Sequence, residues 1–288
     1  MKLAPKSLIL INTNILTIDP VCPQATWVAI ENDKFVETGF GDDWKNLRNK
    51  SSGIIDCRGK TVLPGFIDAH LHLVSYAKSF VIPNVNPSQN VFSIADIQSI
   101  IHNCSLNRPP GKWIFGRGYN EFYLAEKRHP DRWDLDKAAP ENPVKLTHRS
   151  GHTHILNSAA LKLVGITKET GDPDGGMIER DLKTGEPTGQ LYEMGDFLSR
   201  RISALAPAEI EQGLQLANHE LISLGITSIQ DASFHNDKDR WELFMSWKAS
   251  GKLQPRVDMM LGYQAFKDKS DLNFPIYKNE TQLTLRSE

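Results

Sequence analysis

The sequence predicts an α/β protein in which a small sheet of hairpins precedes helices that alternate with buried strands. Residues 7–40 consist of short β-branched and apolar runs with turn residues between them. Residues 66–73 follow a Pro-Gly break and are almost continuously apolar, which is typical of a strand buried on both faces. The apolar stripe of 207–224 ends at Gly225 and leads directly into a strand, which is half of a strand–helix–strand unit.

The other elements follow from spacing and from turn residues. Asn and Asp within 31–34 tolerate left-handed backbone and predict a hairpin turn. Isoleucines at helical spacing predict a helix over 93–104. The stretch 130–205 is rich in Gly, Pro and Asp, which predicts a loop-rich insertion, and residues 171–189 within it predict consecutive turns around one short strand at 176–180. Later in the chain we expect a strand over 226–232, a helix over 239–250 and a strand over 256–262.

The composition is that of an ordinary globular chain. The 288 residues are 40% hydrophobic and 24% charged, enough for one large domain or two ordinary ones. The net charge is −2, with no block of one sign. Neither nucleic acid nor an anionic membrane is therefore expected as a partner.

Cysteine use and the N-terminal residues predict a cytoplasmic protein. Cys22, Cys57 and Cys104 are odd in number and far apart, so we expect reduced thiols and not a disulfide framework. Polar residues at 12–14 interrupt the first apolar stretch, which is too short for a signal sequence or a membrane span.

Two histidines one residue apart, His70 and His72, end the apolar run 66–73. Side chains alternate along a strand, so both imidazoles point to one face, with Cα atoms about 6.5–7 Å apart. Zinc binds imidazole nitrogen at about 2.0–2.1 Å, and two rings that lean together can satisfy that distance. The alternatives are a metal site and a pair of solvated or hydrogen-bonded histidines. The position at a strand end favours a metal site, because sites in parallel sheets gather there.

Four segments resemble one enzyme family, in the same order along the chain. The segment "VLPGFIDAHLHL" (62–73) resembles the first barrel strand of the amidohydrolase superfamily, whose members are metal-dependent hydrolases on a (β/α)8 barrel. Three later segments are similar to its YtcJ-like, amidohydrolase-3 branch: "RHPDRWDLDKAAPENPVKLTHRSGHTHILNSAAL" (128–161), "PDGGMIERDLKTGEPTGQLYE" (173–193) and "LGITSIQDAS" (224–233).

The resemblance implies an incomplete (β/α)8 TIM-like barrel preceded by a partial β-sandwich. Residues 1–64 would be the N-terminal part of a composite sandwich domain, which the family completes with strands from later in its chain. Residues 65–288 would form a partial barrel, with a loop-rich α+β insertion at about 80–205 after the first barrel strand. His70 and His72 would be the metal ligands of that first strand.

Three further residues are candidates for the site. His152 lies in the Gly-His segment of the branch, where it either faces the substrate or forms a hydrogen bond within the insertion. Asp231 ends a predicted strand, where a carboxylate either contacts substrate or caps the next helix. Asp68 precedes His70 on the same face and is expected to orient a ligand histidine, the alternative being a turn role. His154 forms a second His-x-His pair with His152, but its loop-like flanks do not favour a metal.

Much of the family's catalytic machinery has no counterpart in this sequence. The family uses a bridging carboxylated lysine or a glutamate, two further histidines and an aspartate base from later strands, whereas we find at most three barrel strands. A hydrolytic zinc site needs about three protein ligands. We therefore expect the N-terminal part of a longer enzyme, and we assign no catalytic residue.

Two functions remain open. The first is a metal-dependent amidohydrolase that hydrolyses a non-peptide carbon–nitrogen bond of an amide or cyclic amide through a metal-activated water. The second is a catalytically silent, truncated remnant that lacks most metal ligands and the general base. The expected cofactor is a divalent metal with zinc as first candidate, although two imidazoles do not separate zinc from iron or manganese. The expected partner is a small-molecule substrate, and homo-oligomerisation is left open.

Overall fold

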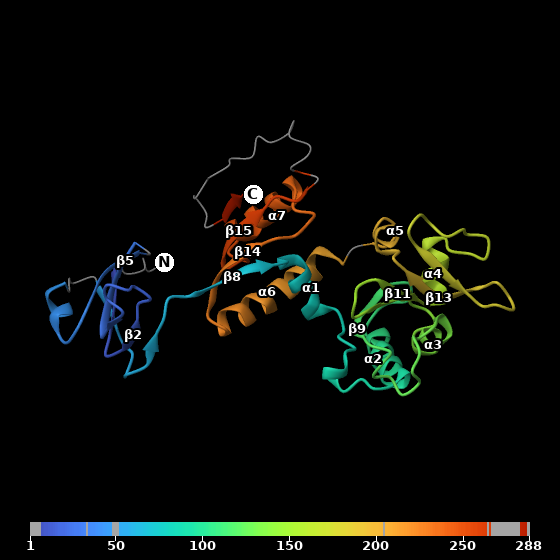
Figure 1. The fold of residues 1–288 in the computed structure, drawn as a ribbon, viewed down its shortest axis with the longest axis horizontal. Helices are drawn as coiled ribbons and strands as arrows, with labels where there is room; N and C mark the ends of the chain where they lie inside the picture. Colours follow the sequence, from blue (N-terminus) through green and yellow to red (C-terminus); the bar gives the residue numbers. More distant parts are fainter. Residues whose placement is uncertain are drawn as a thin grey trace. The chain divides into compact units, whose positions relative to one another are not determined.

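The structure is a computed structural model, and it describes residues 7–32, 34–47, 52–203, 205–263, 265 and 283–286 (Figure 1). The chain divides into two compact units. The first unit lies within Met1–Asp68 and Gly225–Ser228, and the second within Ala69–Leu224 and Ile229–Glu288.

The first unit contains two small sheets, with the strand orders β5-β4-β1-β6 and β3-β2-β7. The strand bounds are Ser7–Ile11 (β1), Asn14–Leu16 (β2), Gln24–Ala25 (β3), Trp27–Glu31 (β4), Lys34–Gly39 (β5), Ser52–Asp56 (β6) and Thr61–Val62 (β7), with a 3₁₀ turn at Asp43–Asn46 (η1). The predicted hairpin turn connects β4 to β5, and Asn32 takes a φ of 49° there. A small core forms where Ile9, Trp27 and Ala29 pack together.

A four-stranded sheet of order β16-β15-β14-β8 carries the first histidine pair. Its strands are Phe66–Leu71 (β8), Ile226–Asp231 (β14), Arg256–Met260 (β15) and Leu283–Arg286 (β16). Backbone hydrogen bonds show that β8 and β14 are parallel. Phe66 N donates to Gly225 O at one end of the pair (2.8 Å), and Ala232 N donates to Leu71 O at the other (2.9 Å).

Three strands of this sheet were predicted, and the fourth was not. β8, β14 and β15 confirm the strands expected over 66–73, 226–232 and 256–262. The expectation that the first of them is buried on both faces was wrong, because no residue of β8 is buried, and Phe66 and Ile67 are 54% and 70% exposed. β16 adds a fourth strand to the three that the sequence indicated, because four residues are too few for a clear alternating pattern. The α/β class is therefore correct, while the closure of these strands into part of a barrel stays a prediction.

The helices of this sheet are α1 (Leu73–Val81), α6 (Pro207–Ser223) and α7 (Lys238–Ala249), and Figure 1 shows α1 beside α6. As predicted, α6 begins at Pro207 and stops before Gly225, which has a φ of 75°. Gly213 allows α6 to approach α1 closely, because a Cβ at this position would lie 2.2 Å from the carbonyl oxygen of Ala77. The helix that follows His72 is thus fixed by tight packing.

Residues 84–199 form a more regular body than the sequence predicted. A five-stranded sheet has the order β12-β13-β11-β10-β9. The bounds are Pro87–Gln89 (η2), Ile94–Leu106 (α2), Ile114–Tyr119 (β9), Arg132–Ala138 (α3), Val144–His148 (β10), Thr153–Leu156 (β11), Ser158–Val164 (α4), Met177–Arg180 (β12), Pro187–Tyr192 (β13) and Gly195–Ser199 (α5). The helix expected over 93–104 and the strand at 176–180 are confirmed. Within the described part of 130–205, the Gly and Pro turns alternate with short strands and helices, so this part of the α+β insertion is more regular than its composition indicated.

One buried asparagine explains part of this regularity. Asn157 is fully buried, and its Oδ1 accepts hydrogen bonds from Val144 N (2.9 Å) and Ala160 N (3.0 Å). Its Nδ2 donates to Ala139 O (3.1 Å) and Asn142 O (2.9 Å). A single side chain therefore satisfies four backbone groups, which joins β10 to the start of α4 without regular pairing.

The three cysteines are free and half-buried, in agreement with the expected absence of a disulfide framework. Within the described ranges, none of the helices combines the length and the apolar character that crossing a bilayer requires.

Candidate metal centre

The first His-x-His pair lies where β8 gives way to α1. His70 belongs to β8, and His72 occupies the N-cap position of α1. Both side chains are exposed, and Leu71 between them is half-buried. The two ring centroids are 5.2 Å apart, with the ring planes at 79° to one another. The structure therefore brings the two predicted ligands together on one accessible side of the strand end.

This separation fits two imidazoles that share one ion. With Zn–N bonds of about 2.0–2.1 Å and tetrahedral angles, two bound imidazoles have their centroids about 5 Å apart. The rest of the ligand set is not found in the part of the chain that the structure describes, where no group of three or more His, Cys, Asp or Glu side chains could hold a metal. His70 and His72 therefore fit as two ligands of a site that needs at least one more.

Asp231 lies at the end of β14, beside the strand end that carries the histidines. It is fully buried, and its Oδ2 accepts a hydrogen bond from Leu73 N (2.7 Å), the residue that follows His72. Its Oδ1 accepts from Ser233 N (3.0 Å) and from Asn236 Nδ2 (2.8 Å). Both carboxylate oxygens thus hold other parts of the chain. A direct contact of Asp231 with substrate stays a prediction.

The other predicted site residues lie elsewhere. Asp68 is on β8, two residues before His70, and its effect on a ligand histidine stays a prediction. His152 precedes β11, and its exposed ring lies within hydrogen-bond distance of Glu193 (Nδ1 to Oε2, 2.9 Å). Its contact with substrate also stays a prediction. His154 is buried in β11, where its Nδ1 lies 3.2 Å from Thr147 Oγ1.

A second polar cluster, which the sequence analysis did not identify, lies where β9 and β10 end. His148 Nε2 is 2.8 Å from Glu121 Oε2, and the Tyr119 hydroxyl is 2.8 Å from His129 Nδ1. Burial lowers the pKa of His148 and raises that of Tyr119, so both groups favour their neutral forms. The signal that could have found this cluster is the polar residue at the end of each of two parallel strands.

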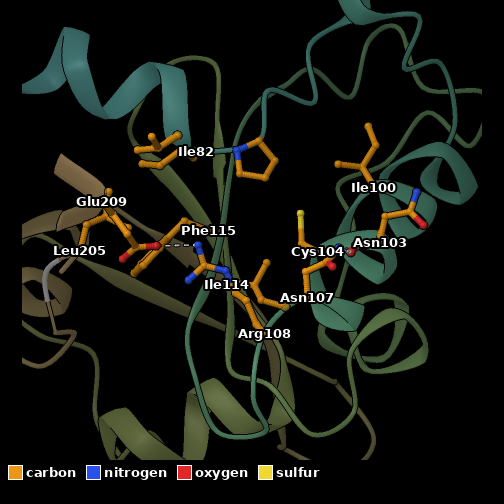
Figure 2. A pocket seen from close by; sticks show the side chains of 12 residues that line it. Ile82, Ile100, Asn103, Cys104, Asn107, Arg108, Ile114, Phe115, Leu205 and Glu209 are labelled. Atoms are coloured by element: carbon orange, nitrogen blue, oxygen red, sulfur yellow. Dashed lines mark hydrogen bonds and ion pairs between the residues drawn. The ribbon is translucent and has the colours of Figure 1, made fainter. Parts of the chain in front are cut away.

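A cavity of about 680 Å³ lies apart from these groups (Figure 2). Its walls are formed by the end of α1, α2, β9 and the start of α6. Arg108 and Glu209, which form an ion pair (2.7 Å), are among the lining residues. Burial raises the pKa of the Cys104 thiol in this wall, which makes it a poor nucleophile. None of the predicted site residues lines this cavity.

Comparison with known proteins gives relatives along most of the chain. The N-substituted formamide deformylase of Arthrobacter pascens is 32% identical over 274 residues, which cover 93% of this chain and 49% of the relative. The Bacillus subtilis protein YtcJ, named as an amidohydrolase, is 28% identical over 218 residues, covering 73% of this chain and 40% of that protein. The chain therefore spans about half the length of these relatives, or less.

Two solved structures share the fold. They are uncharacterised metal-dependent hydrolases from Pyrococcus horikoshii (TM-score 0.73, 19% identity) and Pyrococcus furiosus (TM-score 0.71, 23% identity). The match covers 98% and 96% of this chain, and 53% and 54% of those chains.

The match to a protein family covers most of the sequence. The amidohydrolase family aligns with residues 53–284, a range that includes the first His-x-His pair, the five-stranded body and the strands that follow it. Together with the relatives above, this alignment shows that the chain belongs to the amidohydrolase family, in its YtcJ-like branch.

Proposed function

We propose that this chain takes part in the metal-dependent hydrolysis of a non-peptide carbon–nitrogen bond, in an amide or cyclic amide. The observation that carries the proposal is the pair His70 and His72, two exposed imidazoles 5.2 Å apart at the end of a parallel strand. In this proposal they are two ligands of a divalent ion, with zinc as first candidate. A third ligand and the general base come from outside the described residues.

The role of each group follows from its place in the structure. A bound divalent ion lowers the pKa of a coordinated water and polarises a carbonyl oxygen. His70 belongs to β8 and His72 to the start of α1, so secondary structure fixes the backbone at both histidines.

A relative suggests the substrate to test first. The Arthrobacter pascens protein is named for the deformylation of N-substituted formamides. We therefore propose an N-substituted formamide as the probe, with release of the amine as the readout. Zinc should bind to the chain through His70 and His72, and His70→Ala and His72→Ala should each abolish that binding together with any release of amine. His219→Ala, which removes an exposed histidine from α6, is the matched control and should have no effect.

The second candidate is a catalytically silent chain, and one observation favours it. Among the described residues no third ligand joins His70 and His72. The same experiment separates the two candidates. Metal binding at the two histidines without any release of amine from formamides or cyclic amides would favour the silent chain.

A further inference from the structure

His72 is held from both sides by the end of the neighbouring strand β14. On one side, Leu71 O accepts a hydrogen bond from Ala232 N (2.9 Å). On the other side, Leu73 N donates to Asp231 Oδ2 (2.7 Å). The backbone on either side of His72 is therefore held by hydrogen bonds to two adjacent residues, Asp231 and Ala232, at the end of β14.

The bond to Asp231 replaces an ordinary helix cap. The first N–H groups of a helix lack helical partners, and the side chain of the N-cap residue usually accepts from one of them. His72 occupies the N-cap of α1, yet within the described chain its side chain makes no cap hydrogen bond. Asp231 supplies the acceptor from another strand, and its negative charge suits a helix start. The imidazole of His72 is thus not needed for capping.

Asn236 in turn holds Asp231. This asparagine is fully buried, and its Nδ2 donates to Asp231 Oδ1 (2.8 Å) and to Met260 O at the end of β15 (2.9 Å). The backbone carbonyl oxygen of Asn236 accepts from Gly262 N (2.8 Å), and a Cβ at Gly262 would lie 2.2 Å from Phe234 O. Only glycine fits at position 262, so close to the Phe234 carbonyl. The side chains of Asp231 and Asn236 thus connect the ends of β8, β14 and β15.

We propose that Asp231 and Asn236 are positioning residues for the metal ligand His72. The inference rests on the proposed function of His70 and His72 as ligands. Asp231 fixes where α1 starts, and with it the direction in which the His72 ring leaves the backbone. Asn236 keeps the carboxylate of Asp231 turned toward Leu73. Neither residue touches the ion.

The test is a cobalt titration of the full chain, followed through the visible absorption of Co²⁺ bound to nitrogen ligands. Asp231→Asn keeps the size of the side chain but places an amide nitrogen against backbone donors. Loss of an orienting partner typically costs about 10–100-fold in metal affinity, and we expect a loss in this range. Asn236→Ala removes a partner of Asp231 Oδ1 but keeps the Oδ2 acceptor of Leu73 N, so it should weaken cobalt binding less, by about threefold to tenfold.

Asp136→Asn is the matched control. Asp136 also serves a helix start from another element, because its Oδ1 accepts from Ser158 N at the start of α4 (2.9 Å). It should lower thermal stability without changing cobalt affinity, so a purely structural effect is separated from positioning. All titrations are done on chains whose circular dichroism shows complete folding, and if Asp231→Asn fails to fold, Asn236→Ala carries the test.

The outcomes separate the two proposals. Wild-type chain that binds no cobalt through His70 and His72 contradicts the proposed function and the inference with it. Wild-type binding that depends on both histidines, with unchanged affinity and spectrum in folded Asp231→Asn or Asn236→Ala, overturns the inference alone.

Discussion

The chain contains two His-x-His pairs with the same spacing and opposite surroundings. His70 and His72 are both exposed, and their rings approach to 5.2 Å at a strand end. In the second pair, the side chain of His152 is 66% exposed and bonded to Glu193, whereas His154 is only 5% exposed within β11. Equal spacing therefore does not give equal chemistry. The strand end at β8 keeps both rings exposed and close together, while the pair at the start of an internal strand is divided between solvent and core.

The largest expected effect is on metal affinity. His70→Ala and His72→Ala should each weaken cobalt binding by at least about 100-fold, or roughly 2.7 kcal/mol, because each removes one direct ligand. His152→Ala should leave the affinity unchanged. Isothermal titration of the three variants under one buffer condition measures this. An equal loss of cobalt affinity in all three variants would show that the first His-x-His pair does not differ from the second as a metal site.

The second effect is a dependence of stability on pH that belongs to His154. Burial, assisted by the charges of Lys145 and His152, lowers the pKa of His154 to about 3, while a histidine in an unfolded chain titrates near about 6.5. Between these values the unfolded chain binds a proton that the folded chain does not. The free energy of unfolding should therefore fall as the pH drops below about 6.5, by up to about 1.4 kcal/mol per pH unit.

His154→Leu removes the buried imidazole that titrates and fills its place in the core with an apolar side chain. Between pH 6.5 and pH 5, the free energy of unfolding measured in urea should fall by about 2 kcal/mol more in the wild type than in the variant. His70→Ala, at an exposed position, should keep the wild-type slope. The same slope in wild type and His154→Leu would show that His154 is not the buried titrating group.

The smallest effect is expected at the exposed half of the second pair. His152 and Glu193 lie 2.9 Å apart, with side chains that are 66% and 59% exposed. Even a fully charged pair at this exposure contributes only about 0–1 kcal/mol, so Glu193→Gln should change the free energy of unfolding by less than about 0.5 kcal/mol. A loss well above 1 kcal/mol in urea unfolding would mean that the insertion depends on this contact.

The sequence predicted what depends on local pattern. The strands around His70 and Asp231, and the helix that starts at Pro207, each have an apolar period and a terminating residue close by in the chain. The regular body around Asn157 was missed, because its strands are short and its turns dominate the composition. Spacing alone also gave both His-x-His pairs the same geometry, and only tertiary burial separates them.

The contacts that hold the candidate site could not be predicted from local pattern. Asp231 bonds to Leu73, 158 positions away, and Asn236 bonds to Met260, 24 positions away. Such partners become visible only when the strand order is known. An asparagine that follows a strand end in the sequence is otherwise indistinguishable from a turn residue.

The central claim is that His70 and His72 bind one ion together, and X-ray absorption at the zinc edge tests it most directly. Chain loaded with one equivalent of zinc should show two imidazole nitrogens at about 2.0–2.1 Å, with oxygen ligands completing the shell. His70→Ala and His72→Ala should each lose one imidazole from that shell. A shell of oxygen alone, or an imidazole signal that neither substitution changes, would contradict the claim.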